Sequence, residues 1–442
     1  MSTGEPTDLR RRFLRLTALN ILANASVPLA GLVDVAMLGH LSEIRFLAGA
    51  ALATLVFDYL YWSFGFLRMG TTGTTAQAVG RGDEAEAHRV LYRSLVLAGL
   101  IAGTILVLQV PVRELAFLLL SGGSGVEDAG RDFFRARVWD APATLANFAF
   151  LGWFLGREQS GRALLMTLTA ALANTVFNYF FIVRMGLAAF GSGLGTACSQ
   201  YLSLAVAVVL FFSEPGRRHP WRWSEVLDRE RLLGLVRLNG DILVRTLCLL
   251  SAFSLFTNFS AALGATVLAA NSLLMRLLTF AAYAIDGAAF AAESLSGIFR
   301  GAGQREGLRR TARLAFLVGE GFAVVFLLAM AVAPRAVLGL LTSHPPVIES
   351  ALRHAPWLVP FLVIGSLAFI YDGLYLGLTE GHRLRNAMLV SFAVFLPLGL
   401  LGMWLRNNDL LWGALAAFMA ARFLTLHRAW GSVLSASPEA AA

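Results

Sequence analysis

Long apolar blocks follow one another along the whole chain, separated by short stretches that hold most of the charged residues. A helix needs about 20 mostly apolar residues to cross a bilayer, and each block reaches about that length. The pattern predicts an all-α membrane protein with twelve transmembrane helices. The expected spans are 16–38, 46–69, 90–111, 133–156, 163–184, 188–213, 234–260, 264–290, 311–333, 354–378, 386–405 and 408–427.

Composition excludes a water-soluble domain. Hydrophobic residues make up 57% of the 442 positions and charged residues 14%, whereas a soluble protein carries about 25% charged residues. The alternating pattern of a transmembrane β-barrel is absent.

The net charge of +8 indicates membrane topology and no nucleic-acid partner. Every basic residue is arginine, and the arginines concentrate in the N-terminal segment, in alternate loops and in the tail, where Arg422 and Arg428 lie. The positive-inside rule therefore places both termini in the cytoplasm, which predicts a multi-pass protein of a bacterial inner membrane in contact with anionic lipids. The first span lacks a cleavage site for a signal peptide, so we expect it to be retained.

The two halves of the chain repeat each other at an offset of 221 residues. Residues 80–83 (Gly-Arg-Gly-Asp) fall on residues 301–304 (Gly-Ala-Gly-Gln). The same offset brings Gly152 onto Gly373 and Gly156 onto Gly377. Six spans in each half predict two six-helix bundles related by a pseudo-twofold axis along the membrane normal, as in several secondary transporters.

The polar stretch between the halves sets the expected domains. An N-terminal lobe would cover residues 1–213, a cytoplasmic linker residues 214–231, and a C-terminal lobe residues 232–442.

Motifs for other chemistry are missing. A Walker-type phosphate loop needs a lysine, which the chain lacks, and the seven histidines have no metal-ligand spacing. The two cysteines, Cys198 and Cys248, lie in apolar spans and imply no disulfide framework. We therefore expect no enzyme, no cofactor and no metal. Energy would come from an ion gradient, or the protein would be a passive flippase or channel.

Asp34, in the first span, is the candidate proton-coupling residue. A charged side chain at the bilayer centre costs at least about 2.5 kcal/mol, so intramembrane acids are functional candidates by default. Pro28 removes a backbone donor and can let this helix bend. The alternative is an aspartate at the headgroup level near the end of the helix.

Other polar residues inside spans have two interpretations each. Asn174 and Asn178 are four residues apart, on one helix face, and either join helices or line a wet cavity. Thr196 fits helix packing or the same cavity. Asp241 and Arg245 are one helical turn apart and favour a structural or gating pair. Asp372 is expected to form a C-lobe polar site with Arg245 or Arg276.

Residues 28–41, with the pattern Pro-Leu-x-Gly-x-x-Asp-x-x-x-x-Gly-His-Leu, resemble the first helix of the multidrug and toxic compound extrusion (MATE) family. The resemblance is strongest to the branch named for the DNA-damage-inducible protein F. It continues in residues 80–83, in residues 239–246 (Asn-Gly-Asp-Ile-Leu-Val-Arg-Thr) and in residues 371–379.

The resemblance implies two six-helix bundles around a V-shaped cavity. Asp34 matches the first-helix aspartate that carries the coupling proton, and Asn174 and Thr196 match members of its polar network. Asn178 stands where many members have aspartate, which puts a two-carboxylate cation site in doubt. Asp372 matches a tenth-helix aspartate, but the seventh-helix glutamate of the sodium-coupled branch has no counterpart.

Together these observations predict a proton-coupled antiporter that exports organic, cationic or amphipathic compounds by alternating access. A sodium-coupled exporter of the same fold is less favoured. A flippase for a lipid-linked precursor remains the main alternative, although it would need an arginine-lined cavity and few arginines lie inside spans. We expect a monomer.

Overall fold

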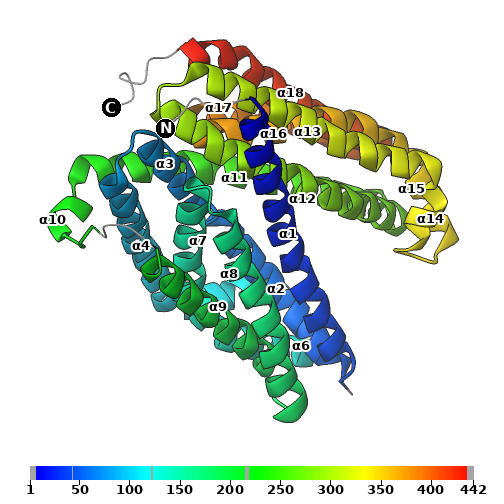
Figure 1. Cartoon of the computed structure of the whole chain (residues 1–442). Coiled ribbons are helices and arrows are strands. Elements are labelled where there is room, and N and C mark those ends of the chain that lie inside the picture. The colour runs from blue at the N-terminus through cyan, green and yellow to red at the C-terminus, as the bar shows by residue number, and fades with distance from the viewer. Residues whose placement is uncertain (1–5, 42, 121–122, 215–218, 436–442) are drawn as a thin grey trace. The chain divides into compact units, whose positions relative to one another are not determined.

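The computed structural model describes residues 6–41, 43–120, 123–214 and 219–435 (Figure 1). Nearly all of these residues are helical, and no β-strand occurs among them. Eleven segments in these ranges are long and apolar enough to cross a membrane. The predicted all-α membrane fold is confirmed.

One predicted span, 133–156, is absent from these eleven segments. It contains the end of α6 (Ser124–Arg137), a turn of 3-10 helix called η1 (Val138–Asp140), and α7 (Ala141–Gly156), which has only 16 residues. Proline fits the first turn of a helix because that turn leaves its N–H groups unbonded. Pro142 lies there in α7, so a new α-helix starts where an unbroken span was expected.

Contacts divide the chain into two compact units, one of which is the continuous segment Leu22–Leu235. It holds the second part of α1 (Pro6–Gly39) together with α6, η1 and α7. Its other elements are α2 (Ile44–Ser63), α3 (Phe66–Gly80), α4 (Glu84–Val107), α5 (Gln109–Leu119), α8 (Ser160–Asn178), η2 (Tyr179–Arg184), α9 (Ala188–Phe212) and α10 (Trp223–Val226).

The other unit is Val236–Ala442 together with Met1–Ile21. Its elements are α11 (Arg229–Leu263, from Val236 on), α12 (Ala265–Gly301), α13 (Arg305–Val332), α14 (Pro334–Gly339), α15 (Pro345–His354), η3 (Ala355–Trp357), α16 (Leu358–Gly377), α17 (Gly381–Trp404) and α18 (Asn408–Ser435). The division falls inside α1, whose start packs on α12: the Asn20 side chain donates to the Gly287 carbonyl at 3.4 Å. The start of α1, from Pro6 to Ile21, thus belongs to the same unit as the second half of the chain, and the predicted lobe boundaries stay a prediction.

Matching glycine contacts within each unit support the 221-residue repeat. A methyl group at Gly152 would meet the Arg68 carbonyl of α3, and one at Gly373 would meet the Ala289 carbonyl of α12. Both partners are also related by the same offset. The absence of a side chain lets α7 touch the backbone of α3, and α16 that of α12.

The second glycine pair behaves in the same way. Gly156 lies against Thr72 and Thr75, and Gly377 lies against Glu293 and Ser296. The turns after these helix pairs match too, since Gly82 and Gly303 have φ values of 75° and 67°. The repeat therefore governs how helices pack as well as how the sequence reads.

The second part of the expected linker is docked on α4. The Tyr92 hydroxyl donates to the His219 carbonyl at 2.9 Å, and the Arg93 guanidinium donates to the Glu225 carbonyl at 2.9 Å. Arg89 binds the Glu225 carboxylate at 2.6 Å, and this hydrogen bond holds the pKa of Glu225 below its ordinary value. Residues 215–218 lie outside the described residues.

Candidate functional site

Asp34 lies near the end of α1 and is half-buried. The side-chain amide of Asn178, at the last residue of α8, donates a hydrogen bond to its carboxylate. The predicted bend residue, Pro28, is in a part of α1 whose side chains lie outside the described residues, and the backbone is helical through it. The structure therefore brings together two predicted site residues that are 144 positions apart.

The hydrogen bonds continue from Asn178 into the unit. The Asn178 amide also donates to the side-chain oxygen of Asn174 at 3.3 Å, and the Asn174 amide donates to the Thr196 hydroxyl at 3.1 Å. Thr196 in turn donates to the Ser192 carbonyl of its own helix at 3.0 Å. Asn178 is fully buried and Asn174 nearly so. All four predicted N-lobe residues thus form one polar chain, called here the Asp34 network (Asp34, Asn178, Asn174 and Thr196).

Two local features position this network. Gly195 of α9 faces Asn178, so closely that a methyl group there would lie 3.0 Å from the Asn178 side-chain carbon. Only a glycine lets α9 approach the amide in this way. Directly after Asn178 the chain winds as a π-helix, η2. Such segments are rare and are frequent at functional sites.

A second polar cluster in the same unit was not assigned from the sequence. Asp140 is 1% exposed; the Tyr61 hydroxyl of α2 donates to it, and the Arg137 guanidinium lies 3.5 Å away. Arg137 also lies over the rings of Phe57 and Phe133, at 4.7 and 5.7 Å from their centroids. The sequence signal that could have found this cluster is the spacing of three between Arg137 and Asp140, which places both on one helix face.

In the C-terminal unit, Asp372 of α16 is held by two arginines. Arg245 of α11 donates to one carboxylate oxygen, and Arg422 of α18 donates to both, with 3.1 Å from its Nε. The predicted pair with Arg245 is present. Arg422 is fully buried, so its assignment to the cytoplasmic tail was wrong, because the pairing with Asp372 lets a helix carry it inside the unit.

The predicted pair between Asp241 and Arg245 does not form. Asp241 instead accepts a hydrogen bond from Arg385 of α17 at 2.7 Å. Gly381, which precedes Arg385 by one turn, lies against Leu238 and Asp241. Close packing between α11 and the start of α17 thus offers Asp241 a cation on another helix.

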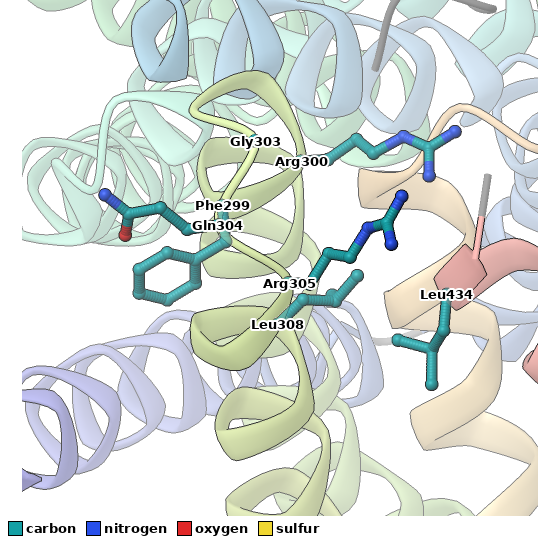
Figure 2. A pocket seen from close by; sticks show the side chains of 7 residues that line it. All are labelled: Phe299, Arg300, Gly303, Gln304, Arg305, Leu308 and Leu434. Carbon is teal, nitrogen blue, oxygen red and sulfur yellow. The ribbon is translucent and has the colours of Figure 1, made fainter. Parts of the chain in front are cut away.

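A hollow of about 240 Å³, part of it open to solvent, lies at the turn between α12 and α13 (Figure 2). Its lining residues are Phe299, Arg300, Gly303, Gln304, Arg305, Leu308 and Leu434. The two arginines donate to carbonyls at the end of α18, those of Val433 at 3.0 Å and Ser435 at 3.1 Å. The hollow therefore belongs to a helix-end contact, separate from the Asp34 network and from Asp372.

The arrangement has proton-accepting and hydrogen-bonding groups but no set of metal ligands. Among the described residues, no three histidine, cysteine, aspartate or glutamate side chains are grouped so that they could hold a metal ion. What the Asp34 network offers chemically is one carboxyl group whose state changes the hydrogen bonds around it.

Comparison with known proteins identifies the family. The MatE family model matches residues 20–180 and 242–401, which together make up most of the chain and fall once in each half. The chain belongs to the MatE family. It is a MATE multidrug efflux transporter by family, and the two matches agree with the repeat.

The relatives of this MATE protein confirm the resemblance, including its branch. The DNA damage-inducible protein F of Escherichia coli is 34% identical over 93% of this chain and 89% of its own length. The probable multidrug resistance protein NorM of Mesorhizobium japonicum is 25% identical, with 96% of each chain covered.

Solved structures show the same fold. A MOP superfamily transporter from Pyrococcus furiosus has a TM-score of 0.87 at 17% identity, covering 98% of each chain. An outward-facing multidrug resistance MATE family transporter gives the same values. This MATE protein is therefore a multi-pass membrane protein of a transporter family with the two-lobe fold.

Proposed function

We propose that this MATE protein exports organic compounds in exchange for protons, and that Asp34 carries the proton. The observation that supports this most is the hydrogen bond between Asp34 and Asn178 at the head of the buried Asp34 network. An acid that faced only lipid or bulk water would have no such network behind it. Burying an ionisable side chain inside a membrane is costly, and such residues occur there mainly where function requires them.

The Asn178 amide suits a carboxyl group that changes protonation. Its nitrogen donates both to Asp34 and to Asn174, which is the orientation that an ionised carboxylate requires. The Asn178 oxygen is buried and has no hydrogen-bond partner among the described residues. A protonated Asp34 can donate to that oxygen if the amide turns over, and the bond to Asn174 then breaks. Protonation of Asp34 in α1 would thereby change the hydrogen bonds of α8 and α9.

Coupling to cargo follows from linkage. If protonation of Asp34 rearranges the polar surface that α1, α8 and α9 share, proton and substrate bind the same rearranging element. Each then lowers the affinity of the other by the same factor. We infer that cargo leaves as the proton binds, and that release of the proton resets the site.

Proton coupling is preferred over sodium coupling for a reason in the C-terminal unit. Asp372 already accepts hydrogen bonds from Arg245 and Arg422. Sodium prefers oxygen ligands with no competing cation, and two guanidinium groups would have to leave first. For Asp34, in contrast, the hydrogen-bond donor among the described residues is a neutral amide.

Location and organisation are part of the same proposal. The arginine distribution supports an inner-membrane protein with both termini in the cytoplasm. The Asp34 network and the Asp372 site lie in different contact units, which supports two lobes with different tasks. Amphipathic or cationic compounds are the proposed cargo, because a carboxylate attracts them.

The test is transport in proteoliposomes with an imposed proton gradient or an imposed sodium gradient, using ethidium as the cargo. We expect the proton gradient to drive transport, and Asp34→Asn to abolish it. Asp132→Asn is the matched control, since Asp132 is an exposed carboxylate of the same unit, paired with Arg135 at 3.3 Å. Full proton-driven transport in Asp34→Asn, or transport driven by sodium alone, would overturn the proposal.

A further inference from the structure

Arg137 is a largely buried charged residue of the Leu22–Leu235 unit that has no part in the proposed proton exchange so far. Its guanidinium is 15% exposed and lies between the rings of Phe57 and Phe133 and the carboxylate of Asp140. Its Nε is buried and is the atom that lies 3.5 Å from the Asp140 carboxylate. A guanidinium is always charged, so this position holds a permanent positive charge inside the unit.

Helix α9 brings the backbone at Arg137 close to the Asp34 network. A methyl group at Gly193 would lie 3.2 Å from the backbone nitrogen of Arg137, while Gly195, two residues on, faces Asn178. Arg137 and Asn178 therefore flank the same turn of α9, and Asn178 binds Asp34 directly. In keeping with this geometry, the Arg137 charge interacts electrostatically with Asp34.

The charges around Arg137 are unbalanced. The titratable groups that interact electrostatically with Arg137 or with its partner Asp140 are Asp34 of α1, Asp58 and Tyr61 of α2, Asp140 of η1, and Tyr201 of α9; Asp132 and Arg135 lie on the same helix as Arg137. Asp132 and Arg135 pair with each other at the surface. Arg137 is the cation that acts on the carboxylates of Asp34, Asp58 and Asp140 among the interactions described for these groups.

We propose that Arg137 is a positioning residue for the proton exchange, a fixed internal counter-ion that favours the ionised form of Asp34 and so sets the pH at which the carrier takes up its proton. This inference rests on the proposed role of Asp34. Burial favours the neutral acid, and a nearby positive charge opposes it. Without Arg137, Asp34 would keep its proton over a wider range of pH and would release it poorly.

Asp140 and Tyr61 hold Arg137 in place. Asp140 is almost completely buried and pairs with Arg137 at 3.5 Å, and Tyr61 supplies the second hydrogen bond to that carboxylate. A buried carboxylate is costly without partners. The ion pair through Nε therefore fixes the guanidinium, which also lies over the rings of Phe57 and Phe133 in cation–π contact.

The test uses the full chain in lipid nanodiscs and follows the infrared band of the protonated carboxyl group that disappears in Asp34→Asn. In Arg137→Gln, we expect this band to persist to a pH higher by roughly one unit, as for one charge removed at close range in a protein interior. The pH profile of proton-driven ethidium transport should move in the same direction by a similar amount.

Controls separate the charge of Arg137 from its structural contacts. Arg135→Gln removes an equal charge from the same helix at an exposed position and should leave the band unmoved. Arg137→Lys keeps the charge and should stay near wild type. If Arg137→Gln does not fold, Arg137→Gln/Asp140→Asn removes both members of the ion pair and should restore folding, with a band nearer to wild type because no net charge is lost.

Each outcome decides between the two ideas. If the Asp34 band titrates at the same pH in Arg137→Gln as in wild type, or if Arg135→Gln moves it equally, Arg137 has no such role and the proposed function is untouched. If no carboxyl band depends on Asp34 at any pH, the proposed function fails, and this inference fails with it.

Discussion

The two halves of this MATE protein share their helix contacts but differ in their buried chemistry. Gly152 and Gly373, and also Gly156 and Gly377, bring matching pairs of helices into backbone contact. At the same 221-residue offset, Leu255 stands opposite Asp34 in the repeat. The repeat therefore conserves packing and leaves the polar side chains free to differ.

The amides differ in the same way. Asn174 and Asn178 of α8 correspond to Phe395 and Gly399 of α17. After Asn178 the chain turns into the π-helix η2, whereas α17 continues as an α-helix to Trp404. The helix that carries the two amides of the Asp34 network is therefore followed by a π-helix, whereas the equivalent part of α17 remains α-helical.

The aspartates of the two halves also differ in the charge of their hydrogen-bond partners. Asp372 has two charged partners and is almost fully buried, while Asp34 is half-buried and has a neutral one. A carboxylate that is paired twice is locked in its ionised form, and one with an amide partner is free to change. The comparison teaches that one half surrounds its buried aspartate with cations, whereas the other pairs its aspartate, the proposed proton carrier, with a neutral amide.

The sharpest way to break this comparison is to neutralise each aspartate in turn. Asp372→Asn leaves the buried guanidinium groups of Arg245 and Arg422 without a counter-charge, and should lower the free energy of unfolding by about 3–5 kcal/mol. Asp34→Asn keeps an amide-to-amide hydrogen bond and should change the free energy of unfolding by less than about 1 kcal/mol. Thermal unfolding in detergent measures both. Equal melting temperatures for the two variants would show that the halves do not differ in this way.

Alanine at the matched glycines tests the shared packing. Gly156→Ala would place a methyl group 2.7 Å from the Thr72 carbonyl, and Gly377→Ala would press against Glu293 in the same manner. Because neither backbone can move aside easily, each variant should cost about 1–3 kcal/mol.

The two losses should be alike if the repeat holds energetically. Gly161, which has no neighbouring atom within 4 Å of an added methyl group, is the control and should be neutral or slightly stabilising as alanine. A large loss of stability in only one of the two variants would mean that the matched glycines contribute differently to packing in the two units.

The smallest expected effect concerns the docked linker. The pKa of Glu225 is lowered chiefly by its hydrogen bond from Arg89, so the contact stabilises docking above the ordinary pKa and loses that effect as the pH falls through the lowered value. A spin label at Ser224→Cys, with Cys198 and Cys248 replaced by serine, should become more mobile once the pH falls below the ordinary pKa of a glutamate. Glu225→Gln should remove this step in mobility; an unchanged step would assign the docking to other contacts.

Much of the candidate site was accessible from local patterns. Asp34 was recognisable because an acid in an apolar span is costly, and Asn174 and Asn178 because a spacing of four places them on one helix face. Their meeting with Thr196 came from the family resemblance. The partner of Asp34 could not be read from spacing, since Asn178 lies 144 residues away.

Charged pairs were the least accessible. Asp241 had an arginine one turn away, yet it binds Arg385 of another helix. Arg422 followed the expected pattern of a tail arginine, yet it is fully buried beside Asp372. Local spacing shows which residues of one helix can meet. An arginine on a neighbouring helix has the same chemistry, and only the tertiary structure shows which of the two arginines an aspartate binds.

The sequence alone determined the membrane fold, the repeat and the identity of the acid in the first helix. These properties depend on how many apolar residues occur in succession and on local spacing, and a bilayer tolerates few alternatives to a helix. Only the tertiary structure decided which polar groups meet: Asn178 with Asp34, Arg422 with Asp372, and Arg385 with Asp241. These contacts depend mostly on the approach of distant helices, which small residues such as Gly193 and Gly195 allow.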